Sequence, residues 1–290
     1  MKKTLALTLS LFVFSQIQSQ TLSEKIATNA CKYLDKITDI NVLQDSIKGS
    51  IIKSMLETRE ESSLEEQKQM TTVEGIRGTM KQVFDILPSY CYNVRKLVID
   101  NKRSMFYGLS ANVKANKHFD KGNKYLESRN FKKAIKNFKS AIKIDPNFVY
   151  AIDHLAIAYR RQKNFKKAIK YYKKSLEIFP EGNLALLNIA VCYASLKNDE
   201  NAIDNYQKLK FYYPNDPEGY FGLAKLLFIK KDYENALDNL FIAHRMYIEA
   251  DSEYQKDSQK LFDYIAAELD KIGKSEMLER KAKENNITIH

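Results

Sequence analysis

Histidines are the side chains in this sequence best suited to ligate a metal ion or to transfer protons near neutral pH. There are four, His118, His154, His244 and His290, and none has a partner at the spacing of a metal site. The motifs H-E-x-x-H, G-x-S-x-G and C-x-x-C, typical of metalloprotease, hydrolase and redox chemistry, are also missing from the sequence. We therefore expect no catalytic residues, no metal, no cofactor, and a protein that is not an enzyme.

Composition favours helices as the structural elements. Of the 290 residues 44% are hydrophobic, while glycine (9) and proline (5) are scarce. So few turn residues favour an all-α fold over turn-rich β architectures. The length corresponds to about two domains.

Residues 1–19 have the pattern of a cleaved signal peptide. Two lysines open the chain, and the stretch from Leu5 to Phe14 is apolar apart from two hydroxyl residues. An apolar run of about 10 residues is too short to span a membrane, and Ser15 and Ser19 offer small residues to a signal peptidase. An uncleaved anchor or a buried N-terminal helix is the alternative. We expect an exported protein, periplasmic or secreted, that does not span the membrane.

Three cysteines would then lie in a compartment that permits disulfides. Cys192 falls at a core-like position, which predicts a buried free thiol. Cys31 and Cys91 both lie in the N-terminal region, and we predict that they pair. Such a bond would stabilise this region by a few kcal/mol in the chain-entropy model.

A period of 34 residues runs through the middle of the chain. Small residues let two helices cross closely, large residues fill the space between them, short polar residues cap a helix and proline ends one. The columns are Ala134, Ala168, Ala202 and Ala236; Gly122, Ala156, Ala190 and Ala224; Phe138, Tyr172, Tyr206 and Leu240; Asn130, Asn164, Asn198 and Asp232; and Pro146, Pro180 and Pro214.

This pattern resembles the tetratricopeptide repeat (TPR), a 34-residue helix–turn–helix unit with small, aromatic and proline residues at these positions. The resemblance implies a right-handed α–α superhelix within residues 114–250. Its four units would be residues 115–148, 149–182, 183–216 and 217–250. It also implies a partner, another protein or a peptide segment, bound in the concave groove.

The resemblance carries over groove positions from the first helix of each unit. The candidate partner-binding residues are Phe119, Asn123, Tyr150, Asp153, His154, Ile157, Arg160, Leu187, Asn188, Phe221 and Lys225. Asn123 and Asn188 match a clamp for a C-terminal carboxylate, but its lysines are missing, so we do not expect one. A groove this apolar suits an amphipathic or extended apolar segment. In the alternative, the chain's own N-terminal bundle or C-terminal helix fills the groove.

The flanking regions lack the 34-residue period. Residues 20–113 are predicted to form a helical N-terminal domain, similar to the small helical domain that precedes repeats in some exported proteins of Bacteroidota. In residues 251–290, the spacing of Leu261, Ile265 and Leu269 predicts a helix that caps the last repeat. The charged tail after it, residues 274–285, is expected to form at most a weakly packed helix.

Positive charge is concentrated in the first two repeats. Residues 115–182 contain 17 Lys/Arg and 6 Asp/Glu, a net of +11, which equals the formal net charge of the whole chain. Many of these lysines fall on second helices, whose outer face is convex and solvated in such arrays. A solvated surface is one interpretation, and a patch for an anionic membrane, polysaccharide or acidic protein is the other. Nucleic acid is not expected, because no stacking aromatics are arranged on this basic face.

The sequence thus predicts a non-catalytic protein–protein interaction or assembly scaffold in the cell envelope of a Gram-negative bacterium. The alternative function is a binder of an anionic surface through the basic convex face of the first two repeats.

Overall fold

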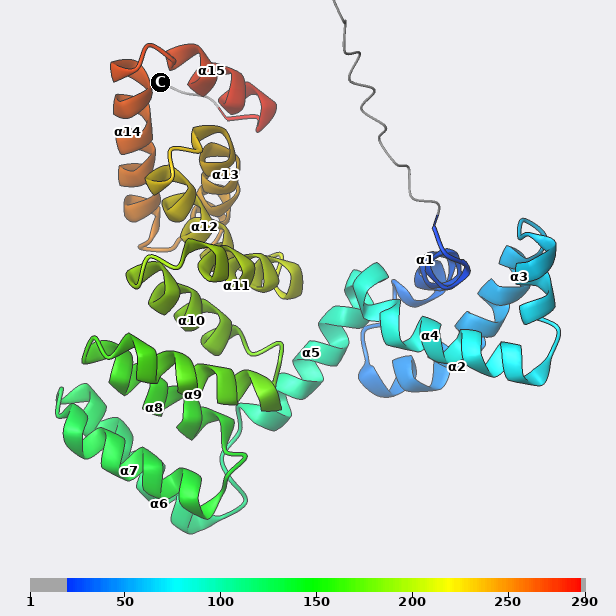
Figure 1. The fold of residues 1–290 in the computed structure, drawn as a ribbon, viewed down its shortest axis with the longest axis horizontal. Helices are drawn as coiled ribbons and strands as arrows, with labels where there is room; N and C mark the ends of the chain where they lie inside the picture. The colour runs from blue at the N-terminus through cyan, green and yellow to red at the C-terminus, as the bar shows by residue number, and fades with distance from the viewer. Residues whose placement is uncertain (1–19, 288–290) are drawn as a thin grey trace, which may run out of the picture. The chain divides into compact units, whose positions relative to one another are not determined.

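The computed structural model describes residues 20–287, so the predicted signal peptide, residues 1–19, lies outside the described residues. Every regular element in the described part is a helix, α1 to α15 (Figure 1). The chain forms two compact units, of which the first ends at Leu97 and the second begins at Val98. This division lies inside one helix, and the domain boundary after residue 113 stays a prediction from the sequence.

The first unit is a small helical bundle. Its elements are α1 (Leu22–Leu34), α2 (Ile40–Arg59), α3 (Leu64–Gln69), α4 (Val73–Tyr90) and the first part of α5 (Tyr92–Phe106). A capping box between Thr21 and Glu24 starts α1, which then packs on both α2 and α4. A disulfide joins Cys31 to Cys91, with their Cα atoms 5.2 Å apart.

The second unit contains four antiparallel helix pairs stacked in chain order (Figure 1). The pairs are α6 (Val113–Glu127) with α7 (Phe131–Ile144), α8 (Val149–Arg161) with α9 (Phe165–Ile178), α10 (Asn183–Ser195) with α11 (Asp199–Tyr212), and α12 (Pro217–Ile229) with α13 (Tyr233–Glu249). Neighbouring first helices also contact one another, so α6, α8, α10 and α12 line one face.

The small and large columns meet inside each pair. A Cβ added to Gly122 would lie 2.5 Å from the Phe138 ring, so this crossing has no room for a side chain. Phe138 and Tyr172 are fully buried, as are the four alanines of the repeat. Helices α7, α9 and α11 end two residues before Pro146, Pro180 and Pro214.

The turn between the two helices has the same capping hydrogen bond in all four pairs. The side chains of the polar column accept hydrogen bonds of 3.3 or 3.4 Å from the backbone N–H three residues later, which confirms their predicted capping role. The residue before each cap has a positive φ of 56° to 63°, although none is glycine. These residues are Arg129, Lys163, Lys197 and Lys231.

Two helices follow the last repeat, α14 (Gln255–Lys271) and α15 (Ser275–Glu284). The apolar face of α14, with Ile265 and Leu269 fully buried, covers α13. This arrangement gives the array the cap that an exposed terminal repeat needs.

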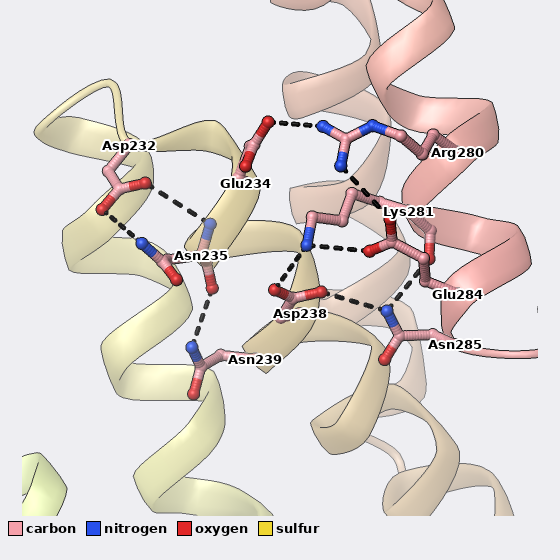
Figure 2. Close-up of polar contacts among 9 residues, drawn as sticks. All are labelled: Asp232, Glu234, Asn235, Asp238, Asn239, Arg280, Lys281, Glu284 and Asn285. Atoms are coloured by element: carbon pink, nitrogen blue, oxygen red, sulfur yellow. Dashed lines mark hydrogen bonds and ion pairs between the residues drawn. The ribbon is translucent and has the colours of Figure 1, made fainter. Parts of the chain in front are cut away.

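Charged residues attach α15 to α13 (Figure 2). Lys281 is largely buried and contacts Asp238 at 2.8 Å and Glu284 at 3.0 Å. Arg280 pairs with Glu234 at the exposed edge of the same contact. Ala282, Met277 and Leu278 also pack against the apolar cluster of α13 and α14, so apolar contacts and the Lys281 ion pairs together hold this helix in place.

No helix among residues 20–287 is both long enough and apolar enough to cross a membrane.

Candidate functional site

The end of α5 and the residues after it pack against the first two repeats, on Tyr150 of α8 and on the loops that follow α7 and α9. The ring of Tyr107 stacks on Tyr150, with centroids 5.2 Å apart, and meets the edge of Phe179 at 5.5 Å. Phe106 stacks on Phe179 at 5.3 Å. Tyr150 was a predicted groove residue, so this part of the groove is filled by the chain itself.

Polar contacts hold both ends of this segment. Lys102 pairs with Glu181 at 2.6 Å, and the Ser110 hydroxyl donates to Asp145 at 2.5 Å. The Asn116 amide also donates to the backbone carbonyl of Ser110 at 2.7 Å. Residues 98–110 are thus fixed on the repeats at several points.

Asp153 lies fully buried beneath this segment. Neither of its carboxylate oxygens makes a well-formed hydrogen bond, nor do the hydroxyls of Tyr107 and Ser175. Burial raises the pKa of Asp153 from 3.8 to about 7, and the two neighbouring hydroxyls offset part of that rise. The groove position that the sequence offered to a partner is here a buried core group whose pKa is raised towards neutrality.

The other predicted residues of the first two repeats mostly contribute to packing. Phe119 is buried and meets the edge of the His154 ring at 5.0 Å. Burial lowers the pKa of His154, whose Nδ1 lies 2.8 Å from the Tyr150 carbonyl. Asn123, Ile157 and Arg160 are half-buried.

The concave face opens between α10, α12 and the start of α14. A hollow of about 500 Å³ lies there, and we name it the α10–α12 hollow. Its apolar lining comes from Leu187, Val191, Phe221, Leu226 and Ile229. Ile229 is 72% exposed, which is high for an isoleucine beside a hollow.

Charged groups stand at the edge of this apolar surface. Glu218 accepts a hydrogen bond from Tyr247 at 2.9 Å, and burial raises its pKa. Lys225 is exposed and lies over the Phe221 ring at 5.3 Å. Asp257 of α14 lines the hollow as well. A bound segment would meet both an acidic and a basic group beside an apolar floor.

One glycine fixes the shape of the hollow. A Cβ on Gly222 would lie 2.2 Å from the Tyr206 ring, which packs across the α12 backbone and lines the hollow. Only glycine lets the ring approach this closely.

The structure therefore divides the predicted binding residues into two groups. Leu187, Phe221 and Lys225 come together in the hollow. Asn188 is largely buried, its amide donating to the Leu184 carbonyl at 2.8 Å. Tyr254 and Asp257 also line the hollow, and the groove positions did not reveal them because they follow the last repeat.

A second feature is the convex face of α7 and α9, which we name the basic face. It carries eight exposed lysines, and none of them forms an ion pair within the described residues. Lys139 and Lys167 instead lie 6.0 and 5.5 Å from the Tyr159 ring centroid. The eight are Lys132, Lys133, Lys136, Lys139, Lys166, Lys167, Lys170 and Lys173.

The cysteines are the remaining candidates for reactive groups. Cys31, Asp35 and Cys91 are the one gathering of three candidate metal ligands in residues 20–287, and both of its sulfurs are in the disulfide. Cys192 is a buried free thiol, and burial raises its pKa to about 11. A thiol held protonated is a poor nucleophile.

Comparison with known protein families identifies tetratricopeptide repeats in the chain, at residues 118–148 and 149–209. No curated protein sequence matches the chain.

Solved structures similar to the chain include several of MamA. The crystal structure of MamA protein is 19% identical, with a TM-score of 0.43, covering 56% of this chain and 94% of that one. MamA MSR-1 is 18% identical, with a TM-score of 0.46, covering 60% of this chain and 96% of that one. MamA from Desulfovibrio magneticus RS-1 is 15% identical, with a TM-score of 0.44, covering 56% of this chain and 98% of that one.

Proposed function

We propose that this chain is a non-catalytic interaction scaffold that binds an apolar segment of another protein in the α10–α12 hollow. The tetratricopeptide repeats support the general role, because such arrays present extended concave binding surfaces. The hollow itself is the observation that carries the proposal. It is an open part of the face lined by the first helices, whereas Tyr150 on the same face is covered by Tyr107.

The hollow has the features of a site for a peptide. Its volume of about 500 Å³ lies within the range of ligand pockets, and its lining is mainly apolar with few charged groups. Glu218 is acidic and Lys225 is basic. Together they favour a bound segment that carries one basic and one acidic residue beside its apolar side chains.

The test compares the same substitution, isoleucine to glutamate, at two positions. Ile229→Glu puts a charge at the hollow, whereas Ile248→Glu puts one on α13 outside it; the two side chains are 72% and 53% exposed. Affinity purification of each variant from the native envelope should lose the partner only with Ile229→Glu. Equal recovery by both variants and the wild type would rule the hollow out.

We also place this scaffold in the cell envelope, periplasmic or secreted. Support comes from the signal pattern in residues 1–19 and from the disulfide, which persists in oxidising compartments. The mass of the protein purified from its own cells tests this placement. A chain beginning after Ser15 or Ser19 supports export, and a chain that retains residues 1–19 in the cytoplasmic fraction contradicts it.

A second candidate function is binding of an anionic surface by the basic face. The favouring observation is eight exposed lysines without ion pairs on two adjacent second helices. Co-sedimentation with phosphatidylserine vesicles at low salt should be lost in the triple variant Lys166→Glu, Lys167→Glu, Lys170→Glu. If the wild type does not bind the vesicles at all, this function is excluded for membranes.

A further inference from the structure

The N-terminal bundle carries an apolar groove of its own. A hollow of about 600 Å³ lies where α2 meets the outer side of α4, and we name it the α4 groove. Its apolar lining is Val73, Ile76, Met80 and Phe84. Val73 is 75% exposed and Phe84 is 37% exposed, so these side chains are not part of the bundle core.

This surface is separate from the face of α4 that the fold uses. Thr79, Val83 and Leu87 are the buried residues of α4, which packs on α1. The groove residues follow one another at intervals of three or four, so they form a second stripe along the same helix. An apolar stripe that the fold leaves uncovered marks an interaction surface.

Charge in the groove has one sign. Its remaining lining residues are Lys48 of α2 and Arg77 and Lys81 of α4, and no acidic residue lines it. None of the three has an ion-pair partner within the described residues. Residues 20–97 contain 11 Lys/Arg and 11 Asp/Glu, so the bundle is neutral as a whole, whereas the three charged residues that line the groove are all basic.

The groove is also held in shape before anything binds. Val83 and Leu87 anchor α4 with no exposed surface, and the disulfide at Cys91 ties the residue after α4 to α1. At its other end, a Cβ on Gly75 would lie 2.0 Å from the Gln69 carbonyl oxygen, so the end of α3 sits directly on the α4 backbone. A preformed site loses less entropy on binding than a mobile one.

We propose that the α4 groove binds an acidic amphipathic helix of a partner protein. The stripe from Val73 to Phe84 spans about 16 Å at 1.5 Å per residue, which is about three helical turns. A helix with apolar residues at matching intervals would lie along it, in the helix-in-groove mode of recognition. Acidic residues on the flanks of that helix would reach Lys48, Arg77 and Lys81, which gives complementary charge.

This partner site is independent of the α10–α12 hollow. The two lie in different compact units, and they differ in charge, since the hollow has Glu218 and Asp257 in its lining while the α4 groove has only basic groups. Failure of one proposal therefore leaves the other standing.

A displayed library of random 16-residue peptides, selected on the full-length mature protein, tests the proposal. Wild-type protein should enrich peptides with apolar residues at intervals of three or four and with Asp or Glu beside them. The exposed pair Arg77→Glu, Lys81→Glu should weaken binding of the most enriched peptide at least tenfold, whereas Lys32→Glu on the exposed side of α1 should not. Unchanged circular dichroism and an intact disulfide verify that the variants fold.

Three results would overturn it. One is enrichment of basic or uncharged peptides, or of peptides whose binding is the same in the double variant. Another is a dimer, seen by light scattering, that dissociates in the double variant, because the groove would then be an interface between copies. The third is binding of phosphatidylserine vesicles through the groove with no peptide enriched, because the occupant would then be a lipid surface.

Discussion

The ring of Tyr107 lies flat against the ring of Tyr150, with centroids 5.2 Å apart, on the face of the repeats where a partner segment would be expected to bind. The contact joins the segment after α5 to the first helix of the second repeat. It lies within the second compact unit, which begins at Val98 and so includes residues before the first repeat. Residues 98–110 are thus part of the folded repeat unit and not a linker.

Removing this contact should destabilise the repeats. We expect Tyr107→Ala to lower the free energy of unfolding by about 3 kcal/mol, because a large aromatic side chain is lost from a packed site. Tyr107→Phe should cost less than about 1 kcal/mol, since the hydroxyl makes no well-formed hydrogen bond. Urea unfolding, combined with hydrogen exchange of α8 amides, measures both. Equal effects of the two substitutions would show that the ring stack contributes little.

Asp153 should make stability depend on pH. Its pKa is raised from 3.8 to about 7 by burial, so between these values the unfolded chain releases a proton that the folded chain keeps. The free energy of unfolding then falls as pH rises, by at most about 1.4 kcal/mol per pH unit, and levels off above about 7. Asp153→Asn should be more stable than wild type at pH 7, with the difference disappearing towards pH 4. Parallel stability–pH curves for the two proteins would contradict this.

Replacing any of the four turn residues that have a positive φ by glycine should stabilise the repeats. Lys163 has φ 58°, a conformation that costs an L-residue energy and that glycine adopts freely. We expect Lys163→Gly to raise the free energy of unfolding by up to about 1 kcal/mol. Lys166→Gly, inside α9, should lower it by about the same amount. A loss of stability in Lys163→Gly would show that the side chain contributes more than the strain costs.

The contact between α13 and α15 should depend on one buried lysine, Lys281. Lys281→Ala leaves Asp238 without its 2.8 Å contact, and only Asn285, which donates to Asp238 at 3.1 Å, remains. We expect α15 to open locally, with its amides exchanging at least tenfold faster while those of α8 are unchanged. Arg280→Ala serves as the control, because the Arg280 side chain is 50% exposed and its pairs should contribute little.

The sequence predicted the repeats because each column has a local physical cause. Asn164 accepts a hydrogen bond three residues along, and Gly122 faces Phe138 within one helix pair, so the 34-residue spacing carried the information. The sequence also predicted a disulfide between Cys31 and Cys91, because both lie in the N-terminal region. The structure confirms this bond.

The site was less predictable because it depends on what lies over the repeats. No spacing rule links Tyr107 to Tyr150, and repeat positions alone therefore offered Asp153 to a partner although it is buried. Tyr254 and Asp257 reach the α10–α12 hollow from the cap, outside the periodic region. The sequence around Lys281 likewise did not indicate that the charged tail would bind α13 through a buried ion pair.

Site-specific photo-crosslinking in the cells that make this protein tests the central claim most directly. A photoreactive residue is placed at Val191 or at Ile229, which both line the α10–α12 hollow, and at Lys170 on the basic face as a control. Mass spectrometry then identifies the crosslinked peptide. We expect the same apolar segment of one protein at positions 191 and 229, and its absence at position 170. Crosslinking at 191 and 229 no greater than at 170 would contradict a partner bound in the hollow.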